Sequence, residues 1–224
     1  MSETNLNEAP STSRIEAFSD GVFAIVVTLL VLELKIPILG HQSTEEEATK
    51  SLMTLIPKFI SWGMSFIIVA IFWVNHHQFM RLIKRSDQKF LWYNIHLLFW
   101  TSFIPFPTAF IGEYYGLKTA VILFAGVLFM ASLAFFLMSK YAFFKGNLHK
   151  NMPLDVRTYA LRRGLIAPGL YLIAIFSAFI NPTVSIVIFF FVPVMYIMPL
   201  DLLNPEEIRK RREHKFHHHK HKKN

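Results

Sequence analysis

The stretch RIEAFSDGVFAIVVTLLVLEL, residues 14–34, decides how the rest of this sequence is interpreted. From Gly21 to Leu32 it is apolar enough to lie in a lipid bilayer, yet polar and charged side chains crowd its start: Arg14, Glu16, Ser19 and Asp20. A charged side chain inside a membrane span is costly unless it is paired. The stretch therefore predicts a membrane helix whose first turns carry either a polar anchor or a functional site.

Composition assigns the chain to the helical membrane proteins. Of its 224 residues, 53% are hydrophobic, 17% are charged and 23 are phenylalanine. Soluble domains carry about 25% charged residues, and a membrane helix needs about 20 mostly apolar residues, a length that several runs here reach. The chain has no cysteine, which excludes disulfides, thiolate metal ligands and cysteine nucleophiles.

Six apolar runs predict six transmembrane helices, at residues 15–36, 52–79, 90–111, 117–144, 159–180 and 183–203. They form one all-α domain, residues 14–204, between a polar lead at 1–13, expected to be disordered, and a basic histidine-rich tail at 205–224. The lead has no basic n-region, so no cleaved signal peptide is expected. Prolines 105, 107, 193 and 199 predict kinks in the third and sixth spans.

Most lysines and arginines lie on one side of the predicted membrane. They gather in residues 81–89, 140–163 and 209–223, whereas the segment HQSTEEEATK at 41–50 is acidic. The positive-inside rule then puts both termini in the cytoplasm. The net charge of +8 therefore indicates contact with anionic lipid headgroups and does not suggest nucleic acid. The histidines of the tail could also bind metal.

No catalytic motif is recognisable in the sequence. It has no P-loop, HExxH or nucleophile elbow, and no TVGYG-type potassium filter. The adjacent His76 and His77 point about 100° apart on a helix, which disfavours a shared metal ion. We therefore expect neither an enzyme nor a cofactor.

Three predicted spans bring polar side chains to one level near the cytoplasmic side: Ser19 and Asp20, then Trp73, Asn75, His76 and His77, then Trp92, Asn94 and His96. Asp20 is expected to pair with one of the histidines, His77, His76 or His96, and Arg14 to join them or reach the lipid headgroups. Two compatible interpretations stay open, a polar contact that fixes helix packing and a proton-sensing gate, because histidine titrates near neutral pH.

One face of the first span is apolar. At 100° per residue it carries Ile25, Leu29, Leu32 and Ile36, with Thr28 about 60° to one side. Asp20 points about 140° away from Ile25, so the polar start and the apolar face look in different directions. By itself such a face is typical of a packing surface.

The motif Arg-x-x-x-Phe-Ser-Asp, RIEAFSD at residues 14–20, resembles the signature of the transmembrane protein 175 family. These are potassium-selective channels of endosomes and lysosomes, with shorter prokaryotic relatives. Six predicted spans in 224 residues are similar to the single-repeat prokaryotic form, and FWVNHHQ at residues 72–78 looks like the family's tryptophan-and-histidine segment. The resemblance covers the whole chain except its ends.

The resemblance implies a homotetramer in which the first span of each subunit lines a central potassium pore without a carbonyl filter. Ile25 would form the narrowest layer, Leu29 and Leu32 further apolar layers, and Thr28 a polar layer. The resemblance also implies an intrasubunit network that holds this span: Arg14, Phe18, Ser19, Asp20, Trp73 and His77. Since potassium is less tightly hydrated than sodium, an apolar neck favours it modestly, and weak selectivity is expected.

A second reading is a secondary transporter coupled to ions or protons. Transporters of that class often contain inverted repeats and helices broken near the midplane. No convincing repeat is found here, and the charged residues lie near one end of the spans. A membrane-embedded enzyme or structural subunit is a third reading, without a catalytic cluster to support it. The sequence thus predicts a potassium channel in the lipid bilayer of a prokaryotic plasma membrane.

Overall fold

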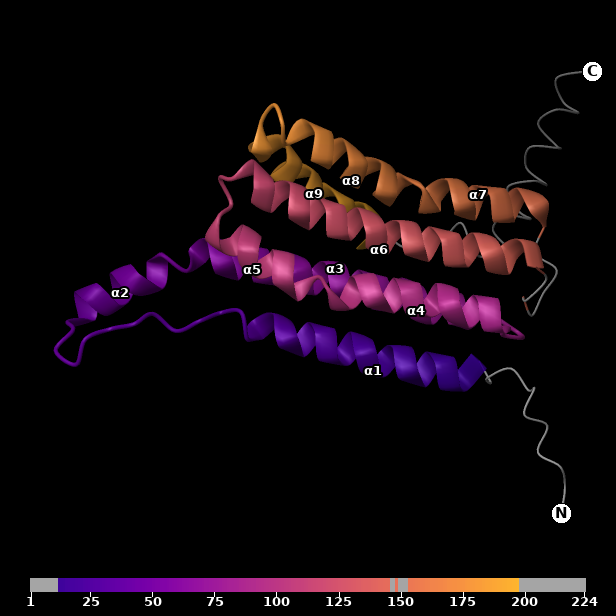
Figure 1. Cartoon of the computed structure of the whole chain (residues 1–224), viewed down its shortest axis with the longest axis horizontal. Coiled ribbons are helices and arrows are strands. Elements are labelled where there is room, and N and C mark those ends of the chain that lie inside the picture. The colour runs from indigo at the N-terminus through magenta and orange to yellow at the C-terminus, as the bar shows by residue number, and fades with distance from the viewer. Residues whose placement is uncertain (1–11, 146–147, 149–152, 198–224) are drawn as a thin grey trace, which may run out of the picture.

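The computed structural model describes residues 12–145, 148 and 153–197, and these residues contain nine α-helices (Figure 1). The helices are α1 Thr12–Val31, α2 Glu45–Met53, α3 Ile56–Met80, α4 Gln88–Ser102, α5 Pro105–Glu113, α6 Lys118–Lys145, α7 Leu154–Gly164, α8 Ile166–Ser177 and α9 Pro182–Ile197. The expectation of an all-helical fold is confirmed. The histidine-rich tail and the end of the sixth predicted span lie outside the described residues.

Four stretches are long and apolar enough to cross a membrane: Ile56–Met80, Gln88–Glu113, Lys118–Lys145 and Leu154–Ser177. Two of them are interrupted, because the second comprises α4 and α5 and the fourth comprises α7 and α8. Helix α9 is apolar but has only 16 residues. Helix α1 has 20 residues and three charged side chains in its first half.

The first helix ends earlier than the apolar pattern predicts. It stops at Val31, and residues 35–40 have no regular structure, so Ile36 does not continue the face of Ile25 and Leu29. The amides of Leu32 and Leu34 bond to carbonyls three residues back, as at a fraying end. Pro37 disfavours helical geometry at Ile36, which explains why the helix does not resume.

The breaks within the long stretches have identifiable causes. Pro105 occupies the first position of α5, where a proline's missing amide costs no helical hydrogen bond. The predicted kink is therefore a boundary between two helices. Between α7 and α8, Pro168 cannot donate to the carbonyl of Gly164, four residues earlier. Pro193 lies inside α9, where the sequence predicts it.

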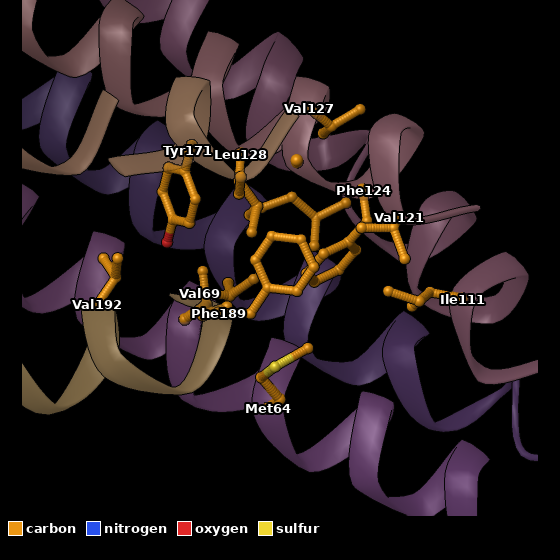
Figure 2. Packing of buried hydrophobic residues seen from close by; sticks show 14 of the residues in the cluster. Met64, Val69, Ile111, Val121, Phe124, Val127, Leu128, Tyr171, Phe189 and Val192 are labelled. Atoms are coloured by element: carbon orange, nitrogen blue, oxygen red, sulfur yellow. The ribbon is translucent and has the colours of Figure 1, made fainter. Parts of the chain in front are cut away.

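Helix α6 is the centre of the bundle. It packs against α4, α5, α7, α8 and α9, and it buries small side chains that let its neighbours approach closely, among them Ala120, Ala125, Ala131 and Ala134. Figure 2 shows the aromatic and aliphatic side chains of this core, where the rings of Phe124 and Phe189 meet edge to face with centroids 5.0 Å apart.

Helix α2 lies beyond one end of the bundle and buries none of its residues (Figure 1). It is held by a capping box, in which Thr44 Oγ1 accepts from the amide of Glu47 and Glu47 Oε2 accepts from the amide of Thr44. The opposite end, where α1 and α4 begin and α3 and α6 end, is called the basic end here. Its basic residues include Arg14, Arg81, Lys84, Arg85, Lys89, Lys145 and Arg157.

Candidate functional site: the first helix and its polar contacts

Helix α1 has two faces of different character. The buried face carries Ile15, Ser19, Phe23, Val26 and Leu30, which recur every three or four residues and pack against α3 and α4. The opposite face is exposed along the whole helix although much of it is apolar. It includes Phe18 and Ile25, each 59% exposed, and Leu29, 42% exposed.

Leu32 follows α1 in the turn after Val31 and is 69% exposed. Thr28 is also exposed, and its hydroxyl donates within the helix, to the carbonyl oxygens of Ala24 and Ile25. Because the hydroxyl hydrogen is used in this way, the side chain offers oxygen lone pairs to whatever lies beside the exposed face. Ile25, Thr28, Leu29 and Leu32 thus form one exposed strip, which we call the apolar strip.

Two contacts join the side of α1 to α3. Trp73 Nε1 donates to Asp20 Oδ1 at 2.9 Å, and His77 Nδ1 lies 3.0 Å from Glu16 Oε1. Glu16 and Asp20 are four residues apart on α1, as are Trp73 and His77 on α3. The two contacts therefore lie one turn apart on antiparallel helices. The rings of Trp73 and His77 stack with centroids 6.0 Å apart, which ties the two contacts together.

A second group of polar side chains is buried between α1, α3 and α4. Asn94 Nδ2 donates to Ser19 Oγ at 3.0 Å, and Ser19 Oγ donates to the carbonyl oxygen of Ile15 at 2.8 Å. Asn94 Oδ1 lies 2.8 Å from His76 Nε2. Ser19, His76 and Asn94 are each 0% exposed. We call these three residues the buried triad.

The buried triad fixes the state of the histidine. Since Asn94 Oδ1 can only accept, His76 Nε2 must carry the proton. His76 Nδ1 is buried and has no hydrogen-bond partner among the described residues. A second proton there would create a buried charge with no acceptor, which is strongly unfavourable. The arrangement therefore describes a neutral imidazole that holds α3 to α4 and, through Asn94, to α1.

The structure arranges the expected network differently from the sequence prediction. Asp20 pairs with the indole of Trp73, and none of the three histidines is its partner: His77 faces Glu16, His76 faces Asn94, and His96 accepts from Trp100 on its own helix. Ser19 belongs to the buried triad. Arg14 and Phe18 are exposed, and Arg14 makes no ion pair with another described residue.

Glu16 and Asn94 are the partners that sequence reasoning did not assign. Glu16 stood out as one of several charges at the start of the helix, and Asn94 as one polar residue at the right depth. The spacing Glu16–Asp20, four residues, matches the spacing Trp73–His77 and could have suggested a paired contact. The membrane depth of Asn94 could have suggested its contact, but its rotation about α4 cannot be read from depth.

Apolar helices of membrane length and a first helix anchored by polar contacts define a helical integral membrane protein. Within this class, a family model described as endosomal/lysosomal potassium channel TMEM175 matches residues 14–105. A potassium channel of Chamaesiphon minutus is 36% identical over 202 residues, covering 85% of this chain and 96% of the relative. A potassium channel of a Chryseobacterium strain is 32% identical over 186 residues, covering 83% and 92%.

A solved structure is similar over the same range. The crystal structure of a lysosomal potassium-selective channel TMEM175 homolog from Chamaesiphon minutus aligns with a TM-score of 0.73 at 34% identity, covering 84% of this chain and 96% of that chain. The protein therefore belongs to the TMEM175 family, and the resemblance drawn from RIEAFSD is confirmed. This is a family of ion channels and not of enzymes.

Proposed function

We propose that this protein is a passive, weakly selective potassium channel, assembled as a homotetramer in which α1 of each copy lines the central pore. The observation that carries the proposal is the apolar strip, because it is exposed on the subunit while the rest of α1 is anchored. Membership of the family and the potassium-channel names of the relatives support the same function.

The strip supplies the chemistry for such a pore. Four copies of Ile25 around an axis make a narrow apolar neck, which a cation passes only after shedding part of its hydration. Potassium holds its water less tightly than sodium, so the neck favours potassium modestly. The Thr28 oxygen, one turn away from the neck, offers lone pairs to a partly dehydrated ion.

The polar contacts hold the strip in position. The pairs Trp73–Asp20 and His77–Glu16, together with the buried triad, fix the rotation of α1 about its own axis. Of the network members that the resemblance implies, Ser19, Asp20, Trp73 and His77 take this anchoring role in our proposal. Arg14 and Phe18 lie on the exposed side of α1 and are assigned to contacts with lipid headgroups and neighbouring subunits.

We further propose six membrane-crossing segments: α1, α3, α4 with α5, α6, α7 with α8, and α9. We place the protein in the plasma membrane of a prokaryotic cell. The basic end then faces the cytoplasm, as the positive-inside rule predicts. Helix α2 and its acidic first turn then lie outside the cell. The histidine-rich tail, which lies outside the described residues, is assigned to the cytoplasmic side.

Flux through proteoliposomes tests the proposal. The purified protein should carry an electrogenic potassium flux without a counter-substrate, and flux that requires one would favour the ion-coupled or proton-coupled transporter. Ile25→Ala should raise potassium conductance about tenfold, equivalent to lowering the barrier by about 1.4 kcal/mol, and shift the potassium/sodium reversal potential toward zero.

The neighbouring Val26→Ala is the matched control, because Val26 is 1% exposed and points into the subunit. It should lower the stability of the protein and leave the reversal potential unchanged. If Ile25→Ala leaves the reversal potential unchanged, or if both variants shift it equally, the neck is not at Ile25.

A further inference from the structure

A cavity of about 160 Å³ lies between α3, α6, the junction of α7 with α8, and α9. It is on the far side of α3 from the Asp20 and Glu16 contacts and is not part of the apolar strip. Its lining is mainly apolar and aromatic, and includes Ile68, Phe72, Phe136, Ala167, Tyr171 and Val192. Figure 2 shows Tyr171 and Val192 on facing helices at the edge of the core.

One part of the lining is polar and positively charged. Arg163 lines the cavity and is half-buried, and its guanidinium lies 5.9 Å from the centroid of the Tyr196 ring, another lining residue. The Tyr196 hydroxyl donates to the Arg163 carbonyl oxygen at 3.1 Å. Among the described residues no carboxylate pairs with this guanidinium. A fixed positive charge therefore borders an apolar cavity, and no described carboxylate neutralises it.

The depth of Arg163 can be placed along α6. The next residue, Gly164, lies against Phe136, nine residues before the end of α6 at Lys145. Helix α6, with 28 residues, is about 42 Å long, about 12 Å longer than the hydrocarbon core of a bilayer. Shared equally between the two ends, that excess leaves about 6 Å of α6 outside the hydrocarbon core at the basic end. Nine residues span about 13 Å, so the backbone of Arg163 lies about 7 Å below the headgroups, a depth that the long arginine side chain spans to reach them.

We propose that this cavity binds an anionic phospholipid, with a stretch of one acyl chain inside and the phosphate against Arg163. A dry apolar cavity of about 150 Å³ admits a group the size of benzene, so an acyl segment fits. A helix of a second copy, about 10 Å across, does not. The guanidinium binds phosphate oxygens in a bidentate way, and stacking on Tyr196 preorganises it.

Two amide side chains on α3 extend the polar part of this site. Asn75 and Gln78 both line the cavity. The Asn75 amide nitrogen donates to the carbonyl oxygen of Ile71, which leaves its oxygen as an acceptor, and Gln78 is exposed. Gln78 can therefore donate to the ester or phosphate oxygens of a lipid whose chain enters beside it. The site depends on the membrane setting of the protein and not on ion permeation.

Lipid titration of the full chain in detergent, read by mass spectrometry of the intact protein, tests the site. Phosphatidylglycerol should bind about fivefold more tightly than phosphatidylcholine of the same chains, as expected for one basic side chain at the headgroup level. Arg163→Gln should abolish this preference. Arg162→Gln is the matched control, because Arg162 is exposed, does not line the cavity and carries the same charge.

A second variant tests binding of the acyl chain separately from binding of the headgroup. Ala160 lines the cavity, and Ala160→Leu should weaken both lipids alike by filling the space that the acyl chain needs. Equal losses of preference in Arg163→Gln and Arg162→Gln would mean only diffuse attraction to the basic end, and would overturn the proposal. Equal binding of both lipids by the unaltered protein would also overturn it, because Arg163 would then not select an anionic headgroup.

Discussion

Helices α1 and α6 differ in how much of their surface the subunit covers. Helix α6 packs against five other helices, and 13 of its residues are buried. Helix α1 buries one stripe of five residues and leaves an apolar strip exposed on its opposite side. The difference teaches that contacts within the subunit surround α6, whereas they hold α1 from one side and leave its apolar strip facing outward.

The sharpest way to break this comparison is to truncate the same residue type on both helices. Phe124 of α6 is 0% exposed, and Phe124→Ala should lower the free energy of unfolding in detergent by about 3–5 kcal/mol through lost packing. Phe18→Ala on α1, 59% exposed, should change the free energy of unfolding of the dissociated subunit by less than about 0.5 kcal/mol. Comparable losses in the two variants would mean that the exposed side of α1 is packed inside the subunit.

The buried triad should contribute the next largest effect. Asn94→Ala leaves His76 Nε2 without a partner, and a buried polar group left unpaired costs about 1–3 kcal/mol of stability. Ser19 Oγ keeps its bond to the carbonyl oxygen of Ile15. Asn75→Ala is the control, because within the described part of the chain its amide bonds only to the carbonyl oxygen of Ile71 on its own helix. Chemical unfolding followed by circular dichroism measures both, and an equally mild loss in the two variants would deny the triad a special role.

The contact between Trp73 and Asp20 should matter less, because Trp73 is 42% exposed. Trp73→Phe keeps an aromatic side chain but removes the Nε1 donor of the indole, and we expect a loss of about 1 kcal/mol. A double-mutant cycle with Asp20→Ala, which removes the acceptor, isolates the pair. Trp92→Phe, at a tryptophan that is 62% exposed, controls for the loss of an indole and should be neutral. A coupling energy of zero in the cycle would remove this contact from the anchor.

The smallest expected effect concerns selectivity and not stability. Thr28→Val keeps the shape of the side chain but removes its oxygen, and should lower the potassium/sodium permeability ratio about twofold, or about 0.4 kcal/mol. Thr101→Val, at a buried threonine of α4, should leave the ratio unchanged. Bi-ionic reversal potentials in proteoliposomes measure the ratio, and an unaltered value for Thr28→Val would assign the selectivity to the apolar side chains alone.

Much of the fold could be predicted from the sequence because membrane helices are long and apolar. The pattern located α3, α6 and α9 within a few residues of their observed starts. It did not locate the end of α1 or the separate helix α2, because both depend on short-range signals, the proline at position 37 and the capping box from Thr44. It predicted a kink in the third span, where Pro105 begins a separate helix, and it treated the fifth span as continuous, although the chain is divided there before Pro168.

The depth of the polar residues in the membrane could be predicted from the sequence, but which side chains bond to each other could not. Polar residues of three spans could be brought to one depth by counting along each helix. The partner of Asp20 could not be predicted, because it depends on how each helix is rotated about its own axis. The structure sets that rotation through Ser19, whose buried contact with Asn94 turns Asp20 and Glu16 toward α3.

Helix α2 has a practical consequence for mapping this protein in cells. It caps itself, buries none of its residues and follows a turn at Gly40–Ser43. Exposed turns of this kind accept insertions without disturbing the core. A short epitope or a single cysteine placed in that turn, in a chain that has no cysteine of its own, gives one reporter whose labelling in intact cells decides which way the whole bundle is threaded through the bilayer.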